Sequence, residues 1–128
     1  MPKAGMHMEI LSLEHTALNV SDLAASKRFY GQGLGLKEIP RPAFSFGGAW
    51  YAIGQNQQLH LIEDAALVQP SNRENHHFAL QVRNIDEVKS ELEAKGIKIA
   101  MGPVARPDGV MQIFVIDPDG YVIELSNT

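Results

Sequence analysis

The chain has 128 residues, of which 45% are hydrophobic and 20% charged, so it is long enough for one ordinary domain with a buried core. Its formal net charge of −4 leaves no basic surface, which argues against nucleic acid and anionic membranes as partners. There is no cysteine, which excludes disulfides, thiolate ligands and thiol nucleophiles. Residues 1–10 (MPKAGMHMEI) have no long apolar run, so we expect a flexible lead-in to a cytoplasmic protein, with His7 exposed.

The first half of the chain predicts one strand, one helix and three further strands. Apolar and polar residues alternate over 11–20 as in a half-buried strand, and Ser21 is suited to cap a helix over 22–32. A glycine cluster at 31–35 ends that helix. Three strands are then expected, at residues 36–39, 43–53 and 57–63.

The second half repeats this order after a linker. Residues 65–75 show no periodicity and are predicted to connect the two halves. A strand over 76–82 precedes a helix over 86–95 that ends at Gly96. The sequence DPDG at 117–120 predicts a tight turn, because proline presets φ and glycine accepts a positive one. The remaining strands are expected at residues 97–101, 111–116 and 121–126.

One sequence pattern occurs twice, with a histidine at the same place in each copy. His15 lies in HTALNV and His77 in HFALQV, and the segment GLK at 35–37 matches GIK at 96–98 where each helix should end. We therefore predict one α+β domain over residues 11–128, built from two repeated βαβββ units at 11–64 and 76–127. A repeat of this length exists because neither copy buries its apolar face alone, which places the duplicated histidine at the seam.

Strand alternation decides which way the polar side chains point. In each unit the apolar positions of the first strand should pack against the helix, which turns the histidine to the uncovered face. The same reasoning places His60 and Glu124 on that face of the last strand of their units. Two such sheets, set side by side as incomplete barrels, would curve around a shared cavity with His15, His60, His77 and Glu124 in its wall. Three imidazoles and one carboxylate suit divalent metals, so the sequence predicts a metal site.

Three segments resemble the vicinal oxygen chelate superfamily, which includes glyoxalase I, fosfomycin-resistance thiol transferases, extradiol dioxygenases and bleomycin-resistance proteins. They read LEHTALNVSDLAASKRFY, HHFALQV and FVIDPDGYVIEL, and the resemblance extends over about residues 11–127. It implies one divalent metal ion per site (Zn, Ni, Mn, Co or Fe), with His15, His77 and Glu124 at the family's ligand positions. His60 falls where glyoxalase I has its other ligand. Family members commonly dimerise so that the first unit of one chain meets the second unit of its partner, so a homodimer is expected.

The resemblance also implies a reaction class. A metal held by four protein ligands keeps about two positions open, and these can take neighbouring oxygens of a small substrate. We expect a glyoxalase-like lyase or isomerase that stabilises an enolate-like intermediate, with Glu124 also moving a proton. Arg106, on a loop that could close over the cavity, is the candidate contact for an anionic substrate group, and Trp50 and Asn19 are candidate substrate-binding residues of the cavity wall.

Other activities remain open on the same scaffold. An iron-dependent extradiol-type dioxygenase needs two histidines and one glutamate, which His15, His77 and Glu124 would satisfy. A fosfomycin-type thiol transferase is a further alternative, although Ala17 stands where those enzymes usually have a threonine. The third alternative is a metal-free small-molecule-binding resistance protein, against which the complete ligand set argues.

The glutathione contacts usual in bacterial glyoxalase I are absent. Asn19 stands where that class usually has an arginine, and Asp64 where it usually has an asparagine. The negative charge of Asp64 would repel an anionic thiol conjugate. Efficient glutathione-dependent glyoxalase I activity is therefore not expected.

Overall fold

The computed structural model describes residues 8–128 and contains two four-stranded sheets. The first unit consists of β1 (His15–Val20), α1 (Leu23–Lys27), β2 (Lys37–Ile39), β3 (Gly48–Ile53) and β4 (Gln57–Glu63). The second consists of β5 (Phe78–Gln81), α2 (Ile85–Ala94), β6 (Ile99–Ala105), β7 (Met111–Ile116) and β8 (Val122–Ser126). Strand order is β1-β4-β3-β2 in one sheet and β5-β8-β7-β6 in the other, so the predicted α+β fold of two repeated units is confirmed, with neither sheet closed into a barrel.

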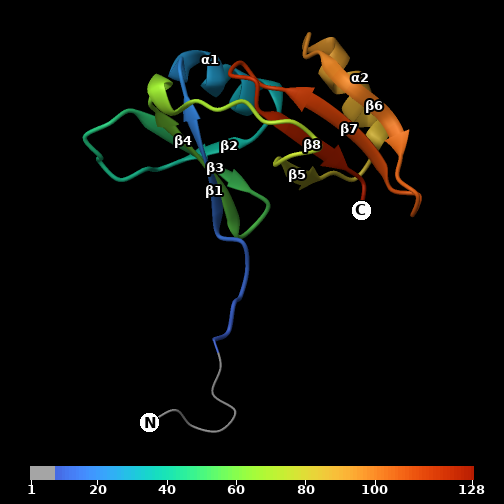
Figure 1. Ribbon diagram of the computed structural model, residues 1–128, viewed down its shortest axis with the longest axis horizontal. Coiled ribbons are helices and arrows are strands. Elements are labelled where there is room, and N and C mark those ends of the chain that lie inside the picture. The colour runs from blue at the N-terminus through green and yellow to red at the C-terminus, as the bar shows by residue number, and fades with distance from the viewer. Residues whose placement is uncertain (1–7) are drawn as a thin grey trace, which may run out of the picture.

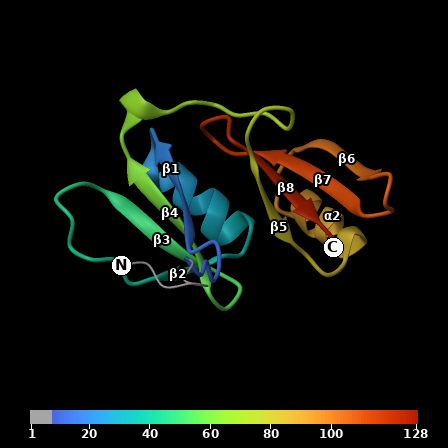
Figure 2. The same ribbon diagram turned by 60° about the horizontal axis from the view of Figure 1, so that its bottom comes forward.

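Both helices lie on the same side of the molecule (Figure 1). The two sheets lie edge to edge, with β1 and β5 at the facing edges (Figure 2). Alternation in β1 follows the prediction, since Leu18 and Val20 are buried whereas His15 and Ala17 are exposed. The largest fully buried side chains come from both units and include Tyr30, Tyr51, Leu59, Leu61, Ile113 and Ile123. The helices cover one face of each sheet, and the face that no helix covers points away from them (Figure 1).

The first helix differs from the prediction at both ends. Its N-cap is Asp22, whose carboxylate accepts a hydrogen bond from the Ala25 amide at 3.1 Å, and not Ser21. The Ser21 hydroxyl instead donates to the Asp119 carboxylate of the second unit. Beyond α1 the chain continues as a π-helical turn over Arg28–Gly33. The helical segment predicted over 22–32 is thus present, but only its first part is α-helical.

The second helix and the DPDG turn follow the prediction closely. Asn84 caps α2 by accepting from the Glu87 amide at 3.1 Å. The helix ends before Gly96, which takes a φ of +72° and so provides the left-handed residue that closes a helix. In the turn, Gly120 has a φ of +90° and its amide donates to the Asp117 carbonyl at 3.1 Å.

Several strand boundaries differ from the predicted ones. The strand expected over 43–53 is limited to Gly48–Ile53, and a short 3-10 helix, Ala65–Leu67, lies within the segment between the units. The strand expected from residue 76 begins at Phe78, so His77 lies just before β5. The strand expected over 97–101 runs over Ile99–Ala105.

Polar contacts made by the DPDG turn hold the second unit against the first. The Tyr30 hydroxyl, on the π-helical turn, donates to the buried Asp117 carboxylate at 2.5 Å. The Tyr121 hydroxyl donates to the Asn19 carbonyl in β1 at 2.8 Å, and the Ser21 amide donates to Asp119 at 3.1 Å. These bonds join residues of the two units that are 87 to 102 positions apart in sequence, so they fix how the two sheets sit relative to each other.

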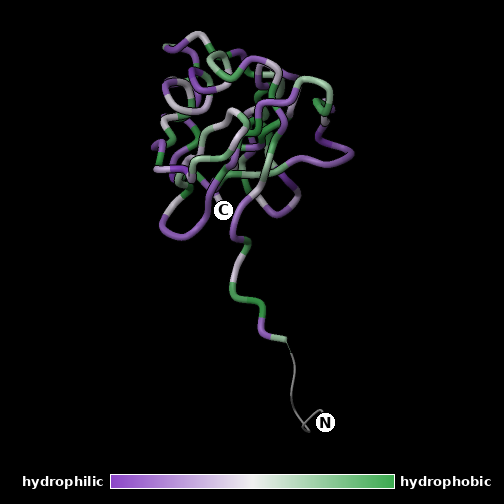
Figure 3. Tube along the Cα trace, turned by 90° about the vertical axis from the view of Figure 1, so that its left-hand side faces the viewer, coloured by the Kyte–Doolittle hydropathy of each residue, from purple (hydrophilic) through white to green (hydrophobic). Residues whose placement is uncertain are grey.

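The segment before β1 is apolar, extended and exposed. The first strand begins at His15 and not at residue 11, because His15 pairs with Gln58 and the partner strand β4 itself begins only one residue earlier, at Gln57. Met8, Ile10 and Leu11 are left 82%, 81% and 82% exposed. The segment projects from the body of the molecule (Figure 3). The lead-in predicted over residues 1–10, with His7, lies mostly outside the described residues.

No helix within residues 8–128 is long and apolar enough to cross a membrane.

Candidate functional site

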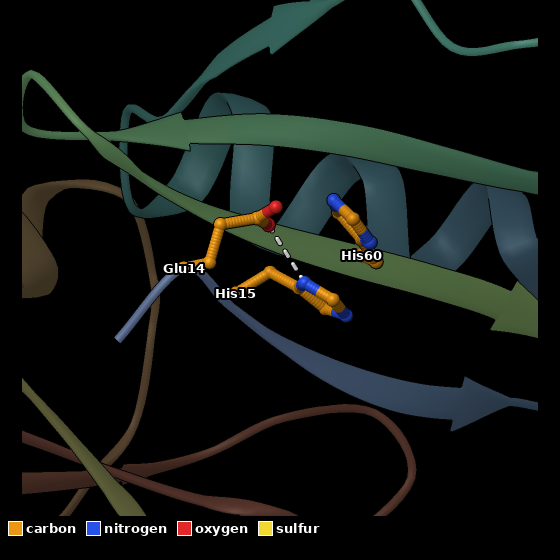
Figure 4. Close-up of side chains that lie close together, drawn as sticks. All are labelled: Glu14, His15 and His60. Carbon is orange, nitrogen blue, oxygen red and sulfur yellow. Dashed lines mark hydrogen bonds and ion pairs between the residues drawn. The ribbon is translucent and has the colours of Figure 1, made fainter. Parts of the chain in front are cut away.

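The first unit brings three potential metal-binding side chains together (Figure 4). Glu14 precedes β1, His15 is its first residue, and His60 lies in the neighbouring strand β4. Their ligand atoms all lie within 4.8 Å of one another, and among residues 8–128 no other group of three such side chains is this compact. We call these three residues the first half-site.

Hydrogen bonds determine which imidazole nitrogens keep a free lone pair. The Glu14 carboxylate lies 2.7 Å from His15 Nδ1, and because a carboxylate only accepts, Nδ1 carries the proton and Nε2 keeps its lone pair. In the same way the Gln58 amide oxygen, 2.8 Å from His60 Nε2, leaves His60 Nδ1 unprotonated in the neutral ring. Burial lowers the pKa of His60, the nearby His15 ring lowers it further, and Glu14 opposes both effects. His60 is therefore neutral at pH 7, which is the form that binds metals.

The second unit holds a buried carboxylate with two partners. His77 Nε2 lies 3.0 Å from Glu124 Oε1, and the Gln112 side-chain amide donates to Glu124 Oε2 at 2.8 Å. Both oxygens are therefore paired, as burial of a carboxylate requires. His77 Nδ1 is buried without a hydrogen-bond partner. We call His77, Gln112 and Glu124 the second half-site.

The register of the two sheets makes the half-sites equivalent. In the first sheet Ala17 pairs with His60, and His15 lies two residues before Ala17. In the second sheet Ala79 pairs with Glu124, and His77 lies two residues before Ala79. Each half-site thus has a histidine at the first strand of its unit, as the first residue in one copy and just before the strand in the other, and a ligand diagonally opposite it on the last strand. This is the repeat equivalence that the sequence predicts.

One chain does not bring the four predicted ligands into one cluster. His15 and His60 belong to the first half-site and His77 and Glu124 to the second, and no compact donor group of the described residues contains members of both. Separate cavities along the seam between β1 and β5 are bordered by His15 and by His77. Within one chain the four predicted ligands therefore do not meet, and the structure of a single chain does not test whether they meet across a subunit interface. The physical reason is that the sheets lie edge to edge with their uncovered faces on the same side, so neither folds over the other (Figure 2).

The predicted substrate-binding residues lie in three different places. The Trp50 ring stacks on the His60 ring with centroids 3.9 Å apart and planes 3° apart. Asn19 borders the same cavity as His77. Arg106 lies on the β6–β7 loop, where its guanidinium forms two hydrogen bonds to the Asp108 carboxylate at 3.0 and 2.6 Å. These bonds lower the pKa of Asp108 to about 2, so the pair stays charged and the Arg106 charge is already compensated.

Sequence reasoning missed Glu14 and Gln112. Strict alternation would turn Glu14 to the face opposite His15, but Glu14 precedes the first residue of the strand and its carboxylate reaches the neighbouring ring. Gln112 could have been found from the sequence. Alternation in the strand over 111–116 places Gln112 on the same face as Phe114, and Phe114 pairs with Glu124 where β7 meets β8.

The donor chemistry and spacing of both half-sites suit a divalent cation. A nitrogen and an oxygen ligand, each about 2.1 Å from a metal and at right angles, lie about 3 Å apart. His77 Nε2 and Glu124 Oε1 have that separation, 3.0 Å. In the first half-site the Glu14–His15 contact is the carboxylate–histidine pairing that commonly supports metal-binding imidazoles. Because the Glu124 carboxylate only accepts, His77 Nε2 carries the proton in this structure, and it must lose that proton or pass it to Nδ1 before it can bind a metal. A complete site also needs the two half-sites to face each other.

Comparisons with known proteins agree on one family. The model of the glyoxalase/bleomycin resistance protein/dioxygenase superfamily matches residues 12–125. The chain is 31% identical to glyoxylase I 4 of Arabidopsis thaliana, over 97% of this chain and 75% of that protein. It is 32% identical to the lactoylglutathione lyase of Salmonella typhimurium, over 90% of this chain and 91% of that protein. A glyoxalase family structure from Bacillus anthracis superimposes with a TM-score of 0.83 at 33% identity, covering 96% of this chain and 99% of that one.

Proposed function

Because the chain belongs to the glyoxalase/bleomycin resistance protein/dioxygenase superfamily, we propose that it is a divalent-metal-dependent lyase or isomerase of the glyoxalase-like type. Its substrate is a small molecule with two neighbouring oxygens, and its metal is Zn, Ni, Mn, Co or Fe. The observation that carries the proposal is the equivalence of the two half-sites, each of which presents metal-binding donors on an uncovered sheet face.

The proposed active form is a homodimer. The first half-site of one protomer would face the second half-site of its partner, so that His15 and His60 from one chain and His77 and Glu124 from the other hold one ion. Two further features support this assembly. Each sheet has an uncovered face, and the exposed apolar segment 8–14 extends from the body on the side away from the helices (Figure 1).

The chain's own residues supply positioning and proton transfer. A bound divalent cation would act as a Lewis acid that stabilises negative charge on a substrate oxygen. Glu14 orients the His15 ring, and Gln58 does the same for His60. Glu124 is the group placed to take a proton from the substrate and return it, because Gln112 anchors its Oε2 while Oε1 faces His77.

Metal content tests the ligand assignment. We expect the purified protein to bind one divalent ion per chain, and the His77→Ala and Glu124→Ala proteins, checked to be folded by circular dichroism, to lose it. Elemental analysis measures this directly. Parent stoichiometry in both variants would show the assignment to be wrong. Tightly bound iron would favour the dioxygenase alternative, whereas zinc, nickel, cobalt or manganese would favour the redox-neutral reaction.

We further propose that the substrate is not a glutathione conjugate. The Asp64 carboxylate is held at the end of β4, where it accepts from the Ala66 amide at 3.2 Å, so its charge remains near the position expected for a glutathione contact. Each ~1.4 kcal/mol of repulsion lowers turnover efficiency about tenfold. Isomerisation of the methylglyoxal–glutathione hemithioacetal should therefore be slow with Ni, Zn, Co or Mn. A kcat/KM near the diffusional range with any of these metals would overturn the proposal.

A further inference from the structure

A row of stacked rings extends from the first half-site across the uncovered face of the first sheet. The His15 and His60 rings have centroids 4.1 Å apart and planes 16° apart, and Trp50 stacks on the other side of His60 at 3.9 Å and 3°. These side chains come from the neighbouring strands β1, β4 and β3. Because parallel rings on adjacent strands turn their faces to each other, it is their edges that are turned away from the sheet. His15 is exposed and Trp50 half-buried, whereas His60 between them is buried.

The row continues into the loop before β3. The Phe44 ring lies 6.2 Å from Trp50, and Phe46 stacks on Phe44 at 5.0 Å with planes 17° apart. Phe44 and Phe46 are 45% and 44% exposed, although each is large and apolar. We call Trp50, Phe44 and Phe46 the aromatic row. Its exposed apolar surface adjoins the candidate metal ligands, at the place where the body of a bound substrate would lie.

A cation sits beside the aromatic row. The Arg41 guanidinium carbon lies 5.0 Å from the Phe44 ring centroid and 5.2 Å from that of Phe46, and Nη2 donates to the Phe46 carbonyl at 2.7 Å. Within residues 8–128, no carboxylate lies within 4.0 Å of this guanidinium, unlike that of Arg106. A Cβ at Gly48 would collide first with the Leu61 carbonyl and would then lie 3.0 Å from Arg41 Nε, so a glycine at this position lets both groups approach. Arg41 is therefore positioned by the fold, with hydrogen-bond donors left to offer.

We propose that the aromatic row and Arg41 bind the part of the substrate remote from its reacting oxygens, and that this part is a planar aromatic group bearing a carboxylate. Ring edges carry partial positive charge, so they favour the π face of an aromatic ring laid across them over a saturated ring of the same size. A guanidinium pairs with a carboxylate through two parallel hydrogen bonds. This proposal rests on the proposed function only in placing the reacting oxygens of the substrate at the first half-site. The aromatic row and Arg41 can bind an aromatic carboxylate without a metal.

Calorimetric titration of the full chain with 2-naphthoate tests the proposal, in metal-free and metal-loaded protein. Two comparison ligands isolate the two features: decahydro-2-naphthoate keeps the carboxylate without aromaticity, and 2-naphthylmethanol keeps the rings without the charge. Trp50 is the single tryptophan of the chain, so its indole N–H gives one resonance in a ¹H–¹⁵N spectrum that reports on the aromatic row. We expect 2-naphthoate to bind at least tenfold more tightly than either comparison ligand, and to shift that resonance.

Two variants and one control locate the binding surface. Arg41→Gln should weaken 2-naphthoate binding about tenfold and leave 2-naphthylmethanol binding unchanged. Phe44→Leu with Phe46→Leu should weaken 2-naphthoate binding about tenfold, whereas Ile116→Ala, at an exposed apolar residue of β7, should not.

Equal affinity for the saturated acid, unchanged binding in Arg41→Gln, or an unmoved Trp50 resonance would each overturn the proposal. So would loss of dimerisation with unchanged acid affinity in the double variant, which would make the aromatic row a subunit interface. Because metal content is measured separately, failure here leaves the metal assignment standing, and loss of the metal assignment leaves the calorimetric result interpretable.

Discussion

Mixing two defective chains distinguishes a metal site shared between protomers from one formed within a chain. His60→Gln removes a ligand from the first half-site, and Glu124→Gln removes one from the second. Glutamine keeps the side chain polar at both positions, and at position 124 it keeps the size that fills the buried space beside Gln112. Each variant alone should form a homodimer in which every site lacks one ligand, so neither should hold the metal tightly.

The magnitude follows from which units meet. In a heterodimer of the two variants, one site combines the two altered half-sites and the other combines the two intact ones. A purified heterodimer should therefore bind about half of the metal of the unaltered dimer, and an unsorted statistical mixture about a quarter. If both half-sites of a site came from the same chain, every site in the heterodimer would lack one ligand and no metal binding would return.

The assay is co-expression of the two chains with different affinity tags, tandem purification of the heterodimer, and elemental analysis after dialysis against metal-free buffer. Each tagged variant purified alone serves as the control for weak residual binding. Circular dichroism confirms that the altered chains are folded. Metal content of the heterodimer no higher than that of the two homodimers would refute the shared site.

Four further variants test the contacts described above. Glu14→Gln should weaken metal affinity about 10- to 100-fold by removing the charge that orients His15, measured by competition with a chelating dye, whereas Glu93→Gln on the exposed face of α2 should change nothing. Tyr30→Phe should lower the free energy of unfolding by about 1.5–3 kcal/mol in urea titrations, because the buried Asp117 carboxylate loses its hydroxyl donor. Burial raises the pKa of Asp117 above its ordinary 3.8, an effect to which the charge of Asp119 adds and which the Tyr30 hydrogen bond opposes. The folded state therefore holds the Asp117 proton to higher pH than the unfolded chain does. The stability contributed by Asp117 is largest below pH ~4 and falls as the pH rises through the folded pKa of this group. In Asp117→Asn, urea titrations at several pH values should show no such decline. Deletion of residues 8–13 should shift the dimer toward monomer in light scattering, and an unchanged dissociation constant would show that the segment makes no subunit contact.

The fold could be predicted from the sequence because its signals are local and repeated. The strands over 57–63 and 111–116 were predicted with their observed bounds, since each is a run of strand-forming residues between clear turn signals. The start of β1 could not be predicted, because a strand begins where its partner begins and the residues before His15 have the same alternating pattern as those after it. The first helix begins one residue later than predicted because Ser21 and Asp22 are both good N-caps. The Ser21 hydroxyl donates to Asp119 of the second unit, so Asp22 caps the helix instead.

The candidate site was predictable in its residue types but not in its assembly. Alternation correctly places His15 on the uncovered face, because a period of two needs no tertiary information. Whether two half-sites meet depends on the angle between the sheets, which is fixed by contacts such as Tyr30 with Asp117 between residues far apart in sequence. No local pattern encodes that angle, so the sequence could not decide whether the four ligands meet within one chain or between two chains.

In the proposed dimer, metal binding and assembly would form a single equilibrium. Each half-site is ordered before any metal binds, since Glu14 already orients His15 and Gln112 already anchors Glu124. Neither half-site alone offers the four protein ligands of the proposed site, so tight binding requires both to face the same ion. An ion that binds the dimer more tightly than the monomer stabilises the dimer by RT ln(1 + [M]/Kd) per site, or about 2.7 kcal/mol at a hundredfold excess over Kd. Removal of the metal should therefore raise the dimer dissociation constant, and raising the protein concentration should raise the apparent metal affinity. These two dependences must appear together, because both express the same free energy.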